Sequence, residues 1–256
     1  MNLQTLPSSN FARPPRPVLP TWRLTVAGAH DLTPNIRRIQ LLTEDPMAWR
    51  PGQDLVLDIP QGEDQPARRH YTIRDSDLAG HELAVDIVRH GQGGPGERWA
   101  EQASPGDRIT AHGPRGRTTL DPDADWHLLV GDETALPAIF AMLEHLPRRA
   151  RALAVIEVGD RADRQYLDAD CDLDLEWQVR GGPAAAASLG LIERLALFAP
   201  RPGRGHAYVL GETATVRIIR QGLLARGLAK DQITAEGYWR PGRLGGHDHI
   251  RDDAAL

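Results

Sequence analysis

The sequence predicts an N-terminal six-stranded antiparallel β-barrel followed by an open parallel α/β domain. Up to about residue 122, strand-like segments alternate with turns rich in Gly, Pro, Asp and Asn. Further along, apolar strands alternate with amphipathic helices. Short strands at regular spacing are typical of a sandwich or small barrel, whereas alternating strands and helices are typical of a parallel sheet covered on both faces. We place the barrel at residues 18–122 and the α/β domain at residues 123–242.

Six segments of the first part have strand character, and turn residues bound each of them. Closing these strands into a barrel removes the exposed sheet edges that they would otherwise leave. The predicted strands are Thr21–Ala27, Ile36–Leu42, Asp54–Ile59, Arg69–Arg74, Glu82–Arg89 and Arg108–Ala111.

The second part starts with the apolar strand Trp126–Val130, and a helix follows because apolar residues from Ile139 to Leu146 recur at helical spacing. The later predicted elements are strands Ala152–Val158 and Leu173–Val179, a helix around Leu191–Phe198, strand His206–Leu210, helix Thr213–Arg226 and strand Ile233–Trp239. We expect residues 1–17 and 243–256 to be mobile tails.

Composition excludes several classes of function. The 256 residues carry a net charge of −5, which argues against nucleic acid or an anionic membrane surface as a partner. No segment approaches the roughly 20 apolar residues of a membrane span. Cys171 is the only cysteine, so an intrachain disulfide is impossible, and we expect a cytoplasmic protein. Lys230 is the only lysine, so anion contacts must come from arginine, histidine or backbone amides.

Residues 69–74, Arg-His-Tyr-Thr-Ile-Arg, are the most informative segment. Strand alternation puts Arg69 and Tyr71 on one face, where an aromatic ring can lie against a flat ring system. An adjacent guanidinium presents a planar fork of donors to phosphate or ring oxygens. Thr72 adds a hydroxyl and a backbone N–H. An open sheet face that carries ordinary strand formers gives the same pattern.

Two further segments favour ligand binding. The run from Asp86 to Gly96 is a strand that ends in a glycine-rich loop, where backbone amides approach an anion closely. A flexible turn with a structural His90 explains the loop equally well. The run from Gly131 to Ile139 begins where the first α/β strand ends, at the edge where open sheets bind ligands. There Asp132 or Thr134 could cap the helix, and Asp132 and Glu133 could serve only as helix charges.

We find no G-x-S-x-G, H-E-x-x-H, P-loop or C-x-x-C motif, and no spacing of residues that predicts a metal site. Trp239 and Arg240, at the end of the last strand, would suit a stacking ring and an anion contact.

Taken together and in order, these motifs resemble the siderophore-interacting protein family, the bacterial ferric-siderophore reductases related to ferredoxin–NADP reductases. The resemblance runs from about Val26 to Gly242, and the Gly-Asp-Glu-Thr-Ala-Leu-Pro-Ala-Ile run at residues 131–139 is its most specific motif. It implies an FAD-binding barrel, an NAD(P)H-binding α/β domain and reduction of ferric siderophores. It names no catalytic side chain.

The resemblance also implies the residues of the site. Those implied to hold FAD are Arg69, Tyr71, Thr72, Asp86, Val88, His90, Gly94, Pro95, Thr134, Ala135 and Trp239. For the anionic substrate, the candidate arginines are Arg74, Arg115 and Arg240. The electron donor is NADPH or NADH, with reduced ferredoxin left open, and we favour a monomer.

Two alternatives remain at this point. A general flavin reductase or electron-transfer flavoprotein would share the FAD site but would not act on siderophores. A non-catalytic siderophore-binding module would bind the chelate without a flavin.

Overall fold

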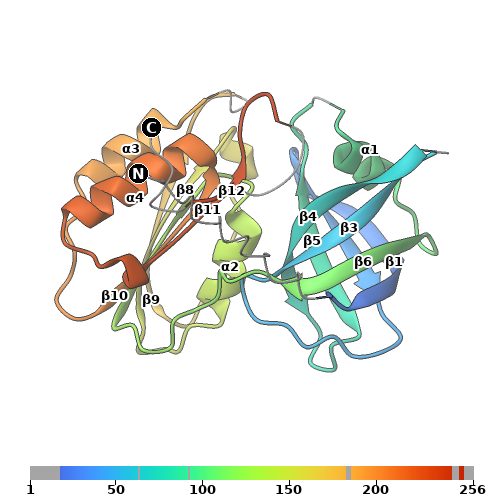
Figure 1. The fold of residues 1–256 in the computed structure, drawn as a ribbon, viewed down its shortest axis with the longest axis horizontal. Helices are drawn as coiled ribbons and strands as arrows, with labels where there is room; N and C mark the ends of the chain where they lie inside the picture. The colour runs from blue at the N-terminus through green and yellow to red at the C-terminus, as the bar shows by residue number, and fades with distance from the viewer. Residues whose placement is uncertain (1–17, 63, 92, 183–185, 244–247, 251–256) are drawn as a thin grey trace, which may run out of the picture.

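The computed structural model describes residues 18–62, 64–91, 93–182, 186–243 and 248–250. A β-barrel and an α/β domain lie side by side in it, with helix α2 (Leu136–Glu144) between the barrel and the sheet of the second domain (Figure 1). The predicted fold class is confirmed. Most of both predicted tails lies outside the described residues.

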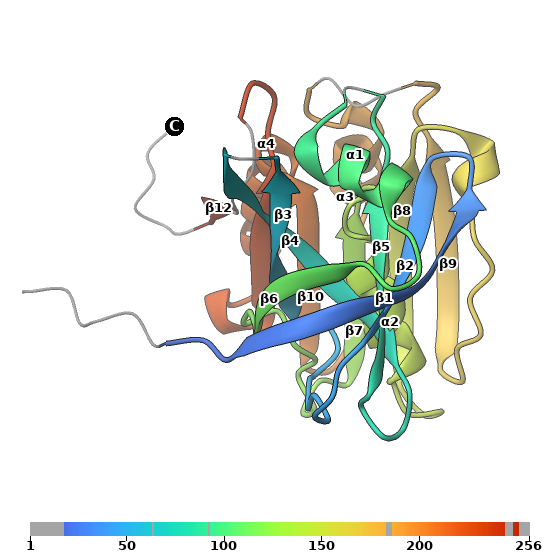
Figure 2. The same ribbon diagram turned by 90° about the vertical axis from the view of Figure 1, so that its right-hand side faces the viewer.

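The barrel is closed by six antiparallel strands in the order β1-β2-β5-β4-β3-β6. β1 runs between β6 and β2 along the side of the barrel (Figure 2). Apolar side chains that alternate along the strands fill the interior, and the short helix α1 covers one end. The elements are β1 (Thr21–Thr33), β2 (Ile36–Leu42), β3 (Asp54–Gln61), β4 (Asp64–Ser76), β5 (Glu82–Val88), α1 (Pro95–Gln102) and β6 (Arg108–Arg115).

The second domain has a six-stranded sheet in the order β12-β11-β10-β7-β8-β9, parallel except for β12. Helix α2 packs on one face of the sheet, and α3 and α4 pack on the other. The remaining elements are β7 (Trp126–Gly131), β8 (Arg151–Val158), η1 (Arg161–Asp163), β9 (Asp172–Val179), α3 (Leu189–Ala196), β10 (Gly205–Glu212), α4 (Thr213–Ala225), η2 (Lys230–Gln232), β11 (Ile233–Trp239) and β12 (Asp248–His249).

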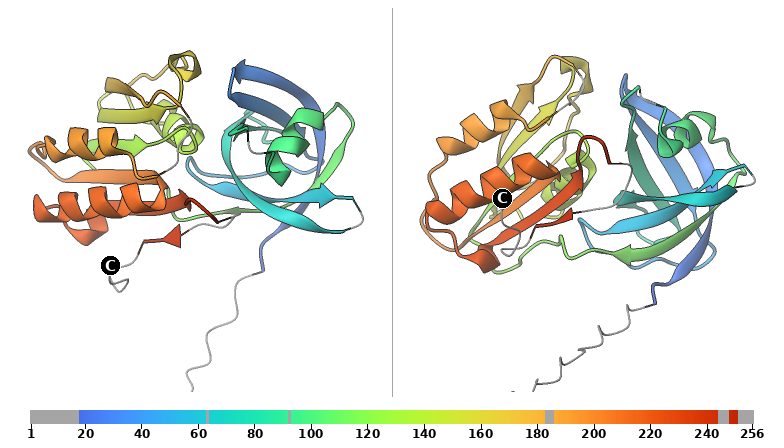
Figure 3. Two further views of the ribbon diagram at one scale, coloured as in Figure 1. Left: turned by 90° about the horizontal axis from the view of Figure 1, so that it is seen from above. Right: turned by 45° about the horizontal axis from the view of Figure 1, so that its top comes forward.

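Two strands extend well beyond the predicted bounds. β1 continues to Thr33 and β4 starts at Asp64, because each keeps pairing with its neighbour as far as a tight turn. β12 lies within the segment predicted as the C-terminal tail, where it pairs with β11 at the edge of the sheet (Figure 3).

The two domains share a packed junction. Ile36 of the barrel belongs to the same buried cluster as the side chains of α2. Asp163, just after β8, accepts hydrogen bonds from the Thr33 hydroxyl (2.7 Å) and from the Asn35 side chain (2.8 Å). Within the described residues, no helix is long and apolar enough to cross a membrane.

Candidate functional site

Arg69 and Tyr71 lie on β4, on the face that lines the barrel interior. They pair across the ladder with Leu57 and Leu55, which are fully buried. At this end of the barrel Gly96 of α1 lies against them: a Cβ there would be 1.8 Å from the Tyr71 hydroxyl and 3.8 Å from Cγ of Arg69. The predicted flavin shelf and the glycine-rich loop therefore meet at the N-terminus of α1.

This N-terminus combines open space with a positive charge. Gly94 is the N-cap, no side chain caps the helix, and among the described residues beyond its chain neighbours no heavy atom lies within 4 Å of the place where a Gly94 Cβ would be. Pro95 occupies the first helical position. Arg69 donates to the neighbouring carbonyl of Arg68 (2.9 Å), and no described carboxylate forms an ion pair with it. Helix N–H groups beside such a guanidinium favour a phosphate-bearing ligand, so the residues fit the diphosphate of FAD.

Glu97 brings a negative charge into the same loop. Its buried carboxylate accepts hydrogen bonds from the backbone N–H groups of Gly91 (2.8 Å) and Gly93 (3.0 Å). Two backbone amides of the loop that the sequence predicted to bind a ligand therefore donate to Glu97 instead. Burial raises the pKa of Tyr71 to about 12; the charge of Arg69 opposes this shift and that of Glu97 adds to it. Tyr71 therefore remains a neutral phenol at physiological pH.

His90 and Trp239 come together from the two domains. Their ring centroids are 6.3 Å apart and the ring planes are tilted by 40°. The indole N–H of Trp239 donates to Oδ2 of Asp132 (2.9 Å). Asp132 is buried, and burial raises its pKa, with the charge of Glu133 adding to the shift. The loop at His90 of the barrel and the end of β11 thus meet between the two domains.

Neither Thr134 nor Asp132 caps α2, although the sequence suggested that either residue could. The backbone N–H of Thr134 donates to Oδ1 of Asp132 (2.9 Å), and its hydroxyl donates to the same atom. The N-cap of α2 is Ala135, which has no side-chain cap. The polar side chains of this turn therefore organise the edge of the sheet and not the start of the helix.

Thr72 and Val88 lie where the barrel meets the second domain. Thr72 is buried and hydrogen-bonds the phenol of Tyr238, whose pKa burial raises well above its ordinary value. Val88 is half-buried and packs against the cluster around α2. Both residues join the two domains beside the candidate site.

Two predicted cofactor-binding residues have buried side chains. Both carboxylate oxygens of Asp86 accept hydrogen bonds from Arg38 (2.7 and 2.8 Å), and the Asp86 side chain has no exposed surface. Ala135 is 0% exposed and packs in the core around α2. The carboxylate of Asp86 neutralises the charge of a partly buried arginine, and the Ala135 side chain packs under the turn, so neither side chain is exposed in this structure.

One predicted substrate-binding residue is also buried. Arg74 is buried, and its guanidinium forms a two-bonded ion pair with Glu144 of α2 (2.6 Å each) over the ring of Phe140. It joins the barrel to α2 and presents no charge at the surface. Arg115 is partly exposed, 3.8 Å from Asp54, and Arg240 is more exposed, 3.8 Å from Asp248. Arg115 and Arg240 remain predictions.

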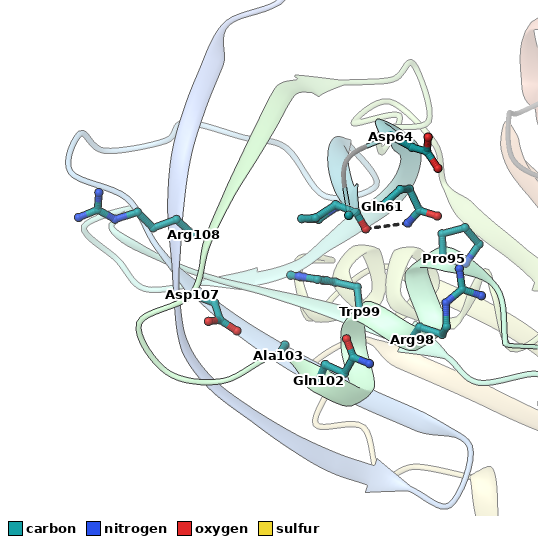
Figure 4. A pocket seen from close by; sticks show the side chains of 11 residues that line it. Gln61, Asp64, Pro95, Arg98, Trp99, Gln102, Ala103, Asp107 and Arg108 are labelled. Carbon is teal, nitrogen blue, oxygen red and sulfur yellow. Dashed lines mark hydrogen bonds between the residues drawn. The ribbon is translucent and has the colours of Figure 1, made fainter.

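A separate cavity of about 540 Å³ lies beside α1 (Figure 4). It is lined by the β3–β4 turn, by α1 and by the start of β6, and Trp99 and Arg98 point toward it from the helix. Of the predicted site residues, the part of the chain that the structure describes contributes only Pro95 to its wall. The cavity is therefore not the predicted site.

Sequence reasoning missed Glu97 and the role of Asp132. An acidic residue three positions after Gly94 is a legible signal, because the third helical residue can reach back to the preceding loop. The contact between Asp132 and Trp239 joins residues 107 positions apart, and nothing in the local sequence marks it.

Comparisons with known proteins agree with this geometry. Residues 44–118 match the model of the siderophore-interacting FAD-binding domain, and residues 124–242 match that of the siderophore-interacting protein. The ferric vibriobactin reductase of Vibrio cholerae is 35% identical over 184 residues, covering 71% of this chain and 67% of that protein. The NADPH-dependent ferric-chelate reductase of Escherichia coli is 30% identical over 214 residues, covering 82% and 74%.

Solved structures agree too. The crystal structure of a siderophore utilization protein from T. fusca superimposes with a TM-score of 0.82 at 32% identity, covering 90% of this chain and 96% of that chain. A cytochrome P450 reductase from Amycolatopsis, at 22% identity and a TM-score of 0.66 over 85% of this chain and 70% of that chain, shares the fold. The chain belongs to the siderophore-interacting protein family.

Proposed function

We propose that the protein is an FAD-dependent ferric-siderophore reductase, which passes electrons from NADPH or NADH through the flavin to a ferric chelate and releases Fe(II) in the cytoplasm. In this proposal residues 18–122 bind FAD and residues 123–242 bind the nicotinamide nucleotide. The observation that carries it is the cradle of Arg69, Tyr71 and the N-terminus of α1. The Vibrio cholerae and Escherichia coli relatives, which are named as ferric vibriobactin reductase and NADPH-dependent ferric-chelate reductase, support the same reaction class.

Each residue of the cradle has a separate task. Arg69 and the first N–H groups of α1 bind the diphosphate, because both favour negative charge. Tyr71 and Thr72 contact the flavin end along β4, and His90 and Trp239 enclose it between the domains. When bound, FAD would link a donor that gives two electrons at once to ferric iron, which accepts one electron. Arg240, which is exposed at the end of β11, attracts the anionic chelate.

The experiment has two parts. Anaerobic addition of NADPH or NADH should bleach the FAD-loaded protein, and a ferric siderophore should restore the oxidised spectrum faster than dyes or quinones do. A protein that takes up no FAD overturns the proposal. Equal rates with all acceptors would favour a general flavin reductase.

The site is tested by Arg69→Ala. Loss of charge-assisted hydrogen bonds to the diphosphate should weaken FAD binding by about 10- to 100-fold, measured by quenching of flavin fluorescence. Arg68→Ala is the matched control, because this neighbour points to the other face of β4 and pairs with Asp58 (3.2 Å). Equal loss in both variants would contradict the assigned role of Arg69.

A further inference from the structure

The carboxylate of Asp132 lies where three strands end and accepts hydrogen bonds from donors on two of them. Asp132 itself follows β7. Its Oδ2 accepts from the backbone N–H of Glu212 at the end of β10 (2.8 Å) and from the indole of Trp239 at the end of β11 (2.9 Å). Because Asp132 is only 4% exposed, these bonds are shielded from water. A buried carboxylate with this set of donors is held in one orientation.

Gly211 shows how closely the carboxylate is packed. This glycine has a φ of +120°, and a Cβ there would lie 2.6 Å from Oδ2 of Asp132. The backbone of β10 therefore touches the carboxylate at a position where no side chain fits. A movement of the Asp132 side chain away from the strand ends would break its hydrogen bonds to Glu212 and Trp239.

Trp239 is fixed at two points. Its carbonyl oxygen accepts a hydrogen bond from the Thr213 hydroxyl (3.0 Å), which sets the backbone. The indole N–H bond to Asp132 then sets the ring, which lies beside His90 of the barrel. The direction of the ring thus depends on a single polar contact.

We propose that Asp132 is a positioning residue that acts through Trp239: it holds the indole as the α/β-domain wall of the flavin site, facing the barrel loop at His90. The proposal rests on the proposed function for the identity of the ligand. Asp132 itself touches no ligand. A phenylalanine at position 239 would keep a ring there but would lose the N–H that fixes its direction.

The contact is tested on the flavin-free protein by ¹H–¹⁵N NMR. The indole signal of Trp239 is assigned from its disappearance in Trp239→Phe. Asp132→Asn should shift this signal and speed its hydrogen exchange. Glu133→Gln is the matched control, because this adjacent acid pairs with Arg180 (2.6 Å) and not with the indole, so the signal should stay in place. An unmoved signal in Asp132→Asn overturns the proposal.

A double-mutant cycle on FAD affinity tests the consequence. Asp132→Asn and Trp239→Phe should each weaken FAD binding by about tenfold, and the double variant should lose no more than either single variant. If Asp132→Asn weakens binding to the same extent in the Trp239→Phe background, Asp132 acts through the fold alone and the proposal is wrong. If wild-type protein binds no FAD, the proposed function fails, while the NMR result still decides whether Asp132 positions Trp239.

Discussion

Glu97 lies in the first turn of α1, and its carboxylate accepts hydrogen bonds from the N–H groups of Gly91 and Gly93 in the preceding loop. A carboxylate at this point repels the diphosphate that Arg69 and the helix N-terminus attract. Glu97→Gln keeps an acceptor for the loop amides but removes the charge. We predict that this variant binds FAD about three- to tenfold more tightly, which fluorescence titration would measure.

Glu101→Gln serves as the control for this prediction. Glu101 lies on the same helix and is exposed, so removing its charge should leave FAD affinity unchanged. Weaker binding in Glu97→Gln would show instead that the charged form is needed to organise the loop.

Single residues of the site were predictable where local rules decide their place. Arg69 and Tyr71 share a face because strand alternation requires it, and Gly94 and Pro95 begin a helix because of their backbone preferences. The ion pairs of Arg74 and Asp86 were not predicted, because their partners, Glu144 and Arg38, lie 70 and 48 positions away. A charged residue looks the same in a sequence whether it meets a ligand or a buried counter-ion.

At the scale of elements, strands β7 and β10 carry a histidine pair away from the candidate site. His127 and His206 are register partners near the strand starts. His127 is buried with no hydrogen-bond partner on Nδ1 among the described residues, and its ring stacks on Tyr208 (6.2 Å). Burial lowers the pKa of His127 to about 4; the nearby charge of His206 lowers it further, and Asp121 opposes the shift.

This histidine predicts acid sensitivity. The imidazole of His127 binds a proton at a higher pH in the unfolded chain than in the folded protein. The free energy of unfolding therefore falls as pH drops from about 6.5 to about 4, by up to about 3 kcal/mol. His127→Phe keeps a ring on Tyr208 but cannot titrate. Urea unfolding at several pH values should show a flatter loss for this variant, with the difference from wild type at pH 5 exceeding that at pH 8. Parallel pH profiles would contradict the prediction.

The elements were more predictable than their bounds. Hydrophobic periods and turn residues located every barrel strand and each strand from β7 to β11, because these signals are local. The ends of β1 and β4 were set by pairing with neighbours, and β12 forms only because β11 offers it an edge. Such ends depend on tertiary contacts that a single segment does not encode.

At the scale of the whole molecule, the site needs both domains in fixed relation, since His90 and Trp239 come from opposite sides of the junction. The junction is partly apolar, around Ile36, and partly polar. One buried polar contact of the junction is made by Asp163, which is 3% exposed and accepts hydrogen bonds from Thr33 and Asn35 across the domains. Domains joined by a well-packed interface unfold together, whereas a weakened interface lets them unfold separately.

We therefore predict that Asp163→Ala uncouples the two domains. The variant leaves donors of Thr33 and Asn35 without an acceptor in a buried junction, at a cost of about 1–3 kcal/mol. Differential scanning calorimetry should show one transition for the wild type and a broadened or split transition for the variant. Asp160→Ala is the matched control, because within the described residues the Asp160 side chain accepts a hydrogen bond only from Ala162 in its own turn; its loss should cost stability without splitting the transition. If both variants unfold in one sharp step, the apolar contacts alone hold the domains together, and Asp163 is not what couples them.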